Sequence, residues 1–149
     1  MSIQPKLLED MKAAMKSGDK LRLETIRGLR AQLKNREIDK GGALSEEDEI
    51  EVLSNAAKKR KESIEQFRAV NQPERAAIEE KELEIIQEYL PRQMGEGEIS
   101  ALVDEIIREV QAASPKDMGK VMGKIMPQVK GRVDGKLVQK IVQQKLTAL

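Results

Sequence analysis

Apolar side chains recur at spacings of three and four residues along almost the whole chain. This spacing is the period of one face of an α-helix, whereas the alternation typical of a half-buried strand is nearly absent. Aromatic residues, which favour strands, make up only 1% of the 149 residues. The sequence therefore predicts an all-α fold.

Local start and stop signals divide the first 91 residues into about four helices. Breaks are predicted at residues 17–19, 41–44 and 71–73, where glycine, serine, asparagine or proline interrupts the periodicity. Ser45 and the acids that follow it predict the start of the third helix, because a serine hydroxyl and negative charges satisfy free amides there. The fourth helix stops before Pro91.

Composition changes after Pro91, where Gly95 and Gly97 flank a short polar segment. Residues 1–91 hold 17 basic and 19 acidic side chains, whereas residues 92–149 hold 10 and 7. We therefore predict an N-terminal helical domain over residues 1–91 and a smaller C-terminal domain over residues 96–149. The smaller domain should have three helices, the second opening at Ser114 and the third at about Asp134.

The chain contains no histidine and no cysteine. This excludes the usual ligand sets for zinc, haem and iron–sulfur clusters, and also histidine-dependent triads and cysteine nucleophiles. The acids at residues 46–49 and 79–84 are interpreted as helix starts and surfaces, and no Walker or Rossmann glycine loop occurs. We predict no catalytic residue, metal or cofactor, so an enzymatic function is disfavoured. Without cysteine or a long apolar N-terminal run, we expect a cytoplasmic protein with no membrane segment.

Basic residues dominate the tail, with eight Lys or Arg against two Asp from residue 115 to 149. Lys116, Lys120 and Lys124 step by four and should share one helix face. The following turn and helix start add the cations Lys130, Arg132 and Lys136 and the glycines Gly131 and Gly135. Such cations, with glycines that permit close approach, suit a phosphate backbone. The alternative is that the lysines solvate a helix surface and the glycines form turns.

Two further patterns have competing interpretations. Gly119 and Gly123 lie one helical turn apart, so they could allow either close packing of two helices or close approach of a ligand. The basic run at residues 58–61 points around its helix and is interpreted as a solvated surface. Glu62 and Glu65 are the expected partners of its three lysines, Lys58, Lys59 and Lys61. The tail has no aromatic residue, so any nucleic-acid contact should involve backbone and shape rather than base stacking.

Several strings of the sequence resemble the GatB/YqeY family. In the tail they are DMGKVMG at 117–123, MP at 126–127 and KGRVDGKLV at 130–138; before it, EDMKAAMK at 9–16, KNREI at 34–38, KRKESI at 59–64 and EYLP at 88–91. The resemblance covers essentially the whole chain and implies an N-terminal helical domain joined to a smaller helical tail domain. It also implies that the tail is similar to the C-terminal domain of the B subunit of tRNA-dependent amidotransferases, which helps hold tRNA. Because the catalytic centre of that enzyme lies in another domain, the resemblance implies binding and no catalysis.

Two functional hypotheses follow. The first is a non-catalytic protein that binds tRNA or another structured RNA, or assists aminoacyl-tRNA or amidotransferase machinery, through its tail. Its expected RNA contacts are Lys116, Lys120, Lys124, Lys130, Arg132, Lys136, Gly119, Gly123, Gly131 and Gly135. The second is a protein-interaction or oligomerisation scaffold formed by the helices of residues 45–90, motivated by the narrow apolar stripe from Leu83 to Leu90.

Overall fold

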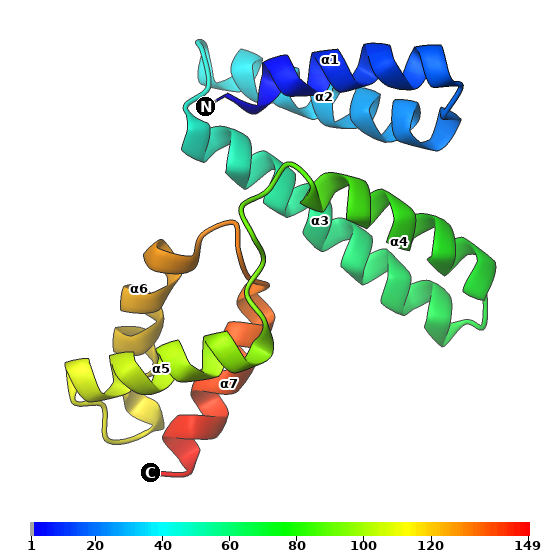
Figure 1. Cartoon of the computed structure of the whole chain (residues 1–149). Helices are drawn as coiled ribbons and strands as arrows, with labels where there is room; N and C mark the ends of the chain where they lie inside the picture. Colours follow the sequence, from blue (N-terminus) through cyan, green and yellow to red (C-terminus); the bar gives the residue numbers. More distant parts are fainter. Residues whose placement is uncertain (1) are drawn as a thin grey trace. The chain divides into compact units, whose positions relative to one another are not determined.

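The computed structural model describes residues 2–149, and in that range it contains α-helices and a 3-10 turn but no strand. The predicted all-α fold is confirmed. The helices, shown in Figure 1, are α1 (Ile3–Ser17), α2 (Lys20–Lys40), α3 (Glu46–Ala69), α4 (Pro73–Gln87), α5 (Glu96–Val110), α6 (Met118–Val129) and α7 (Gly135–Thr147), with the 3-10 turn η1 (Pro115–Asp117) before α6.

The chain divides into two compact units between Pro91 and Arg92. The second unit begins before the predicted residue 96 because the preceding segment is bonded to the turn between α6 and α7. The Met94 amide donates to the Arg132 carbonyl at 2.8 Å, and the Gln93 side-chain amide donates to the Gly131 carbonyl at 2.8 Å. Hydrogen bonds to this turn therefore connect the segment before α5 to the C-terminal unit, which begins at Arg92.

Two helical hairpins, α1–α2 and α3–α4, form the N-terminal unit (Figure 1). One apolar cluster joins them, with Leu7, Leu29, Leu33, Leu53 and Ile86 almost fully buried. Leu83 and Leu90 also pack against this cluster, and Leu90 lies beyond the end of α4. The apolar stripe that suggested a scaffold is therefore covered by the unit's own core.

Local capping explains where the N-terminal helices begin. The Asp19 side chain accepts a hydrogen bond from the Arg22 amide at 3.1 Å at the start of α2. At the start of α3, Ser45 and Asp48 bond reciprocally to each other's backbone amides, at 3.1 and 3.0 Å. Pro73 occupies the first position of α4, where its missing amide hydrogen costs nothing. These helix starts match the predicted breaks.

The C-terminal unit is a bundle in which α5, α6 and α7 all pack against one another. Its core is aliphatic, and Val103, Val121, Ile125, Val138 and Val142 are fully buried. The predicted second helix differs at its start, because Ser114 opens the 3-10 turn η1 and the α-helix begins at Met118. The Asp117 carboxylate accepts bonds from the amides of Ala113 and Ser114, which tightens this turn.

Candidate functional site

The predicted cations on α6 lie on its outer face. Val121, Ile125 and Val129 are buried against the bundle, whereas Lys120 and Lys124 are exposed, and Lys116 is exposed on η1. Within α6, helical spacing places Lys120, Gly123 and Pro127 along this outer face, while Lys116 lies on η1 just before the helix and Lys130 is its C-cap residue. We call this set the α6 outer stripe, and its members are Lys116, Lys120, Gly123, Pro127 and Lys130. All five residues are exposed.

Gly119 and Gly123 do not serve as a helix-packing surface. Both are exposed, and a Cβ atom placed on either would meet no heavy atom within 4 Å. The interpretation that they let two helices of this chain approach closely is therefore wrong. Gly123 instead leaves the middle of the α6 outer stripe low and open between its lysines.

The turn between α6 and α7 has a structural role. Gly131 is buried with a left-handed φ of 80°, a conformation that glycine adopts without strain. Arg132 is half-buried, and its Nε donates to the Arg92 carbonyl at 3.0 Å. Together with the bonds from Gln93 and Met94, these contacts hold the first residues of the unit, so Gly131 and the Arg132 Nε are already engaged.

The cations of α7 lie on a different surface. Lys136 and Lys140 are exposed opposite the buried Val138 and Val142. Because α6 and α7 pack through their apolar faces, their outer faces turn in different directions. Gly135, at the first position of α7, is half-buried. A Cβ atom placed on it would lie 3.8 Å from the Met126 side-chain methyl group. The predicted contacts therefore do not form one continuous surface.

Neighbouring carboxylates neutralise some of these cations. The Lys124 Nζ lies 2.5 Å from Glu109 of α5, and the Lys145 Nζ lies 2.9 Å from Asp104. By contrast, among residues 2–149, Lys116, Lys120 and Lys130 form no ion pair within 4 Å. Hydrogen bonds from the amides of Ala113 and Ser114 lower the pKa of Asp117, and the Lys120 charge adds to this effect.

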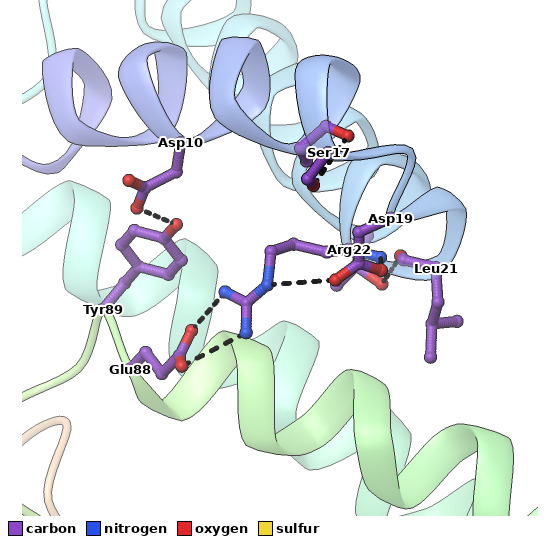
Figure 2. Close-up of polar contacts among 9 residues, drawn as sticks. Asp10, Ser17, Asp19, Leu21, Arg22, Glu88 and Tyr89 are labelled. Carbon is purple, nitrogen blue, oxygen red and sulfur yellow. Dashed lines mark hydrogen bonds and ion pairs between the residues drawn. The ribbon is translucent and has the colours of Figure 1, made fainter.

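A second polar cluster lies in the N-terminal unit, where α1 and the start of α2 meet the residues after α4 (Figure 2). Tyr89 donates its hydroxyl hydrogen to Asp10, and the Lys6 Nζ lies 5.4 Å from the Tyr89 ring centroid. Arg22 forms two bonds with Glu88, at 2.7 and 3.3 Å. A groove of about 500 Å³ opens beside this cluster.

The polar side chains of this cluster form their hydrogen bonds and ion pairs mainly with one another. Burial raises the pKa of Tyr89, and the bond to Asp10 raises it further. The bond to Glu88 raises the pKa of Arg22, so this guanidinium stays charged and paired. The cluster therefore ties α1 and α2 to the end of α4, and its arrangement is that of a structural contact.

Sequence reasoning missed one buried carboxylate. Glu49, interpreted as part of a helix start, is 1% exposed on α3. Its Oε2 accepts bonds from the amides of Ile3 at 3.2 Å and Gln4 at 3.1 Å, and from the Ser2 hydroxyl at 3.0 Å. It caps α1 from another helix. No sequence signal reveals this role, because donor and acceptor lie more than 40 residues apart.

Two other acids were also misinterpreted as free surface. Glu79 and Glu82 of α4 are half-buried, and the Arg60 Nε lies 3.4 and 2.6 Å from them. Desolvation raises the pKa of Glu79, and the neighbouring Glu82 charge adds to this effect. Within the basic run 58–61, Arg60 therefore forms its ion pairs with α4.

Within the described part of the chain, no group of three or more acidic residues is arranged to hold a metal ion. No helix between residues 2 and 149 combines the length and apolarity needed to cross a membrane.

Comparison with known proteins identifies both a family and individual relatives. The family model described as "Yqey-like protein" matches residues 4–146. The protein named "Altered inheritance of mitochondria protein 41, mitochondrial" from Lachancea thermotolerans is 38% identical over 112 residues, covering 73% of this chain and 60% of the relative. Its namesake from Clavispora lusitaniae is 36% identical, covering 69% and 61%. The Kluyveromyces lactis protein of that name is 34% identical, covering 73% and 60%.

These relatives correct one expectation. The chain spans about six tenths of their length, and each is named as a mitochondrial protein. The expected cytoplasmic location is therefore wrong by this comparison. The reason is physical: a chain without cysteine has no thiol to oxidise, so its composition does not distinguish one compartment from another.

Proposed function

The chain belongs to the Yqey-like protein family, and from this membership we propose that its C-terminal unit binds the phosphate backbone of structured RNA, with tRNA as the first candidate. In this proposal the protein is a binding or accessory factor and contributes no catalytic group. An accessory role beside tRNA-dependent amidation is the specific form that the resemblance of the tail favours.

The observation that carries the proposal is the α6 outer stripe. Lys116, Lys120 and Lys130 are exposed and form no ion pair within the described residues, while Gly123 leaves open space between them. Ammonium groups on an open helix surface can bind phosphates without first breaking an internal contact. The absence of aromatic side chains from this unit favours backbone contact over base stacking.

The structure narrows the set of contacts that we propose. Lys124 would have to leave Glu109 before binding a phosphate, and the Arg132 Nε already binds a carbonyl. Lys136 and Lys140 face another direction, so they would bind a separate stretch of RNA. We therefore assign the principal role to Lys116, Lys120 and Lys130, with Gly119 and Gly123 allowing close approach.

The test is a titration of fluorescently labelled tRNA with the full chain at several salt concentrations. The proposal expects saturable binding. The logarithm of the association constant should fall linearly with the logarithm of the salt concentration, with a slope of about 0.7–0.9 for each phosphate contacted. The triple variant K116E/K120E/K130E should lose roughly tenfold or more in affinity and about one unit of slope per lysine.

The matched control is K58E/K59E/K81E, which makes the same charge change at exposed lysines of the N-terminal unit. It should retain most of the affinity. The proposal is rejected if tRNA does not bind saturably at low salt, or if both triple variants weaken binding equally.

A further inference from the structure

The outward side of the α1–α2 hairpin carries a surface that the proposed RNA contact does not use. On α1 a stripe runs through Leu8, Met11 and Met15, and on α2 a stripe runs through Leu23, Arg27, Arg30 and Lys34, each with helical spacing. Asp10 and Arg22 of the same hairpin instead face Tyr89 and Glu88 (Figure 2). The two stripes lie on other faces of α1 and α2 than these two residues.

Apolar side chains form the middle of this surface. Leu8, Met11 and Leu23 are half-buried, and Met15 is 54% exposed. We call this set of four residues the α1–α2 seam. Met11 packs partly against the core cluster that joins the two hairpins, whereas Leu8 and Leu23 belong neither to that cluster nor to the partly buried residues packed on it. The outer part of the seam is thus an apolar strip along α1 and α2.

Cations border the seam on both helices. Lys12 lies on the α1 side, and Arg27, Arg30 and Lys34 lie on the α2 side; all four are exposed. The Arg30 Nη1 lies 3.2 Å from the Met11 sulfur, which places this guanidinium at the edge of the strip. Glu24 is paired with Arg27 at 3.3 Å. Residues 2–40 hold ten basic and six acidic side chains, whereas residues 41–91 hold seven and thirteen.

From this arrangement we infer that the α1–α2 seam is a docking surface for an acidic amphipathic helix of a partner protein. Such a helix would place its apolar stripe over Met15 and the half-buried seam residues, and its flanking carboxylates against Lys12, Arg27 and Lys34. This occupant is favoured because a single acidic amphipathic helix would pair with the bordering cations and also cover the apolar strip. Methionine side chains suit this role because they adapt their shape to the surface that covers them.

Other occupants fit less well. RNA phosphates would pair with the cations but leave Met15 and the rest of the strip uncovered. A flat anionic membrane would reach the protruding Met15 but not Leu8, Met11 and Leu23, which lie between the two helices. A helix that lies along the seam would contact both the apolar residues and the cations.

The test uses a helix-stabilised synthetic peptide of about 18 residues, or five turns. It carries leucines on one face and glutamates on both flanks, and binding is followed by fluorescence anisotropy with the full chain. A scrambled peptide of the same composition, which lacks an apolar face, is the first control. We expect saturable binding of the amphipathic peptide at least about tenfold tighter than that of the scrambled one, since burial needs a continuous apolar stripe.

Two variants separate docking from simple charge attraction. Met15→Lys adds a positive charge but removes the exposed apolar group. If the peptide docks on the seam, its affinity should fall about fivefold; if charge attraction alone holds it, the affinity should rise. R27E/K34E should weaken binding about tenfold, while K58E/K59E, with the same charge change elsewhere on the unit, should leave it nearly unchanged. Circular dichroism of each variant checks that the helices remain folded.

The inference is overturned if the peptide does not bind, or if Met15→Lys binds it more tightly. It is also overturned if tRNA or phosphatidylserine vesicles bind instead, with the same loss in R27E/K34E. The tail variant K116E/K120E/K130E should not affect peptide binding, so the result is independent of the proposed RNA contact.

Discussion

The two units of this chain differ in how their charges are distributed. In the N-terminal unit, ion pairs join different helices: Arg22 with Glu88 at 2.7 Å, Lys40 with Asp48 at 2.6 Å, and Arg60 with Glu82 at 2.6 Å. In the C-terminal unit, Lys124 and Lys145 also pair with carboxylates of α5, but the cations of the α6 outer stripe form no ion pair within the described residues. Charges that are paired inside a unit help to orient its helices, whereas unpaired ones remain able to bind an external anion.

Their interiors also differ. The core of the C-terminal unit consists of aliphatic side chains, whereas the N-terminal unit also buries Glu49, Thr25 and the body of Tyr89. A purely aliphatic core depends on packing alone, whereas a buried polar group also depends on particular hydrogen-bond partners. The comparison therefore predicts that different kinds of substitution will disrupt the two units.

Core truncation should have the largest effect, and that effect should stay within the unit that is changed. Ile125 is fully buried, so Ile125→Ala should cost about 2–5 kcal/mol. A bundle of this size hides only about 60% of its unfolded surface, so that loss is comparable to its whole stability. Hydrogen exchange measured by mass spectrometry should show residues 92–149 losing protection.

The matched variant Leu29→Ala makes a similar truncation in the N-terminal core. It should reduce protection in residues 2–91 and leave the other unit protected. Loss of protection in both units from either variant would show that they do not unfold independently.

Removing the charge of Glu49 should have the next largest effect, confined to the N-terminal unit. Glu49→Gln keeps the size of the side chain but replaces one of the acceptor oxygens of the buried cap on α1 with an amide nitrogen. We expect a loss of about 1–3 kcal/mol, because buried amides would be left without a full partner. Urea unfolding at neutral pH measures this loss. Glu47→Gln, an exposed position on the same helix, should change the midpoint little.

Tyr89 should show the smallest of these effects and a pH dependence. It is the only tyrosine, so absorbance at the phenolate band reports this group alone. Burial and the bond to Asp10 raise its pKa, so the phenol should ionise above the ordinary value of 10.0. Because the folded state favours the neutral phenol, this contribution to stability is complete below pH 10 and declines as the pH rises further.

Two variants check the origin of the shift. Asp10→Asn removes the charge of the acceptor and should move the titration of Tyr89 toward its ordinary range. Tyr89→Phe removes the hydroxyl and should cost about 0.5–1.5 kcal/mol. An ordinary titration in the unchanged folded protein would contradict the structural role assigned to this cluster.

Local patterns in the sequence were enough to predict much of the fold. Ser45, Pro73 and the glycines at 41 and 42 mark helix ends, because capping involves groups only three or four residues apart. The same reasoning placed Lys120 and Lys124 on an exposed helix surface. It missed the 3-10 turn at Pro115, where Asp117 bonds back to two preceding amides.

The sequence by itself thus determined the all-α class, the approximate helix ends and the excess of cations in the tail, since helical period and capping are short-range properties. Only the tertiary structure decided that Glu49 caps α1, that Glu109 neutralises Lys124, and that the cations of α6 and α7 face different directions. The physical reason is distance along the chain. A carboxylate acquires its role from donors on other helices, 45 residues away for Glu49 and Gln4, and periodicity carries no information about which helices will meet.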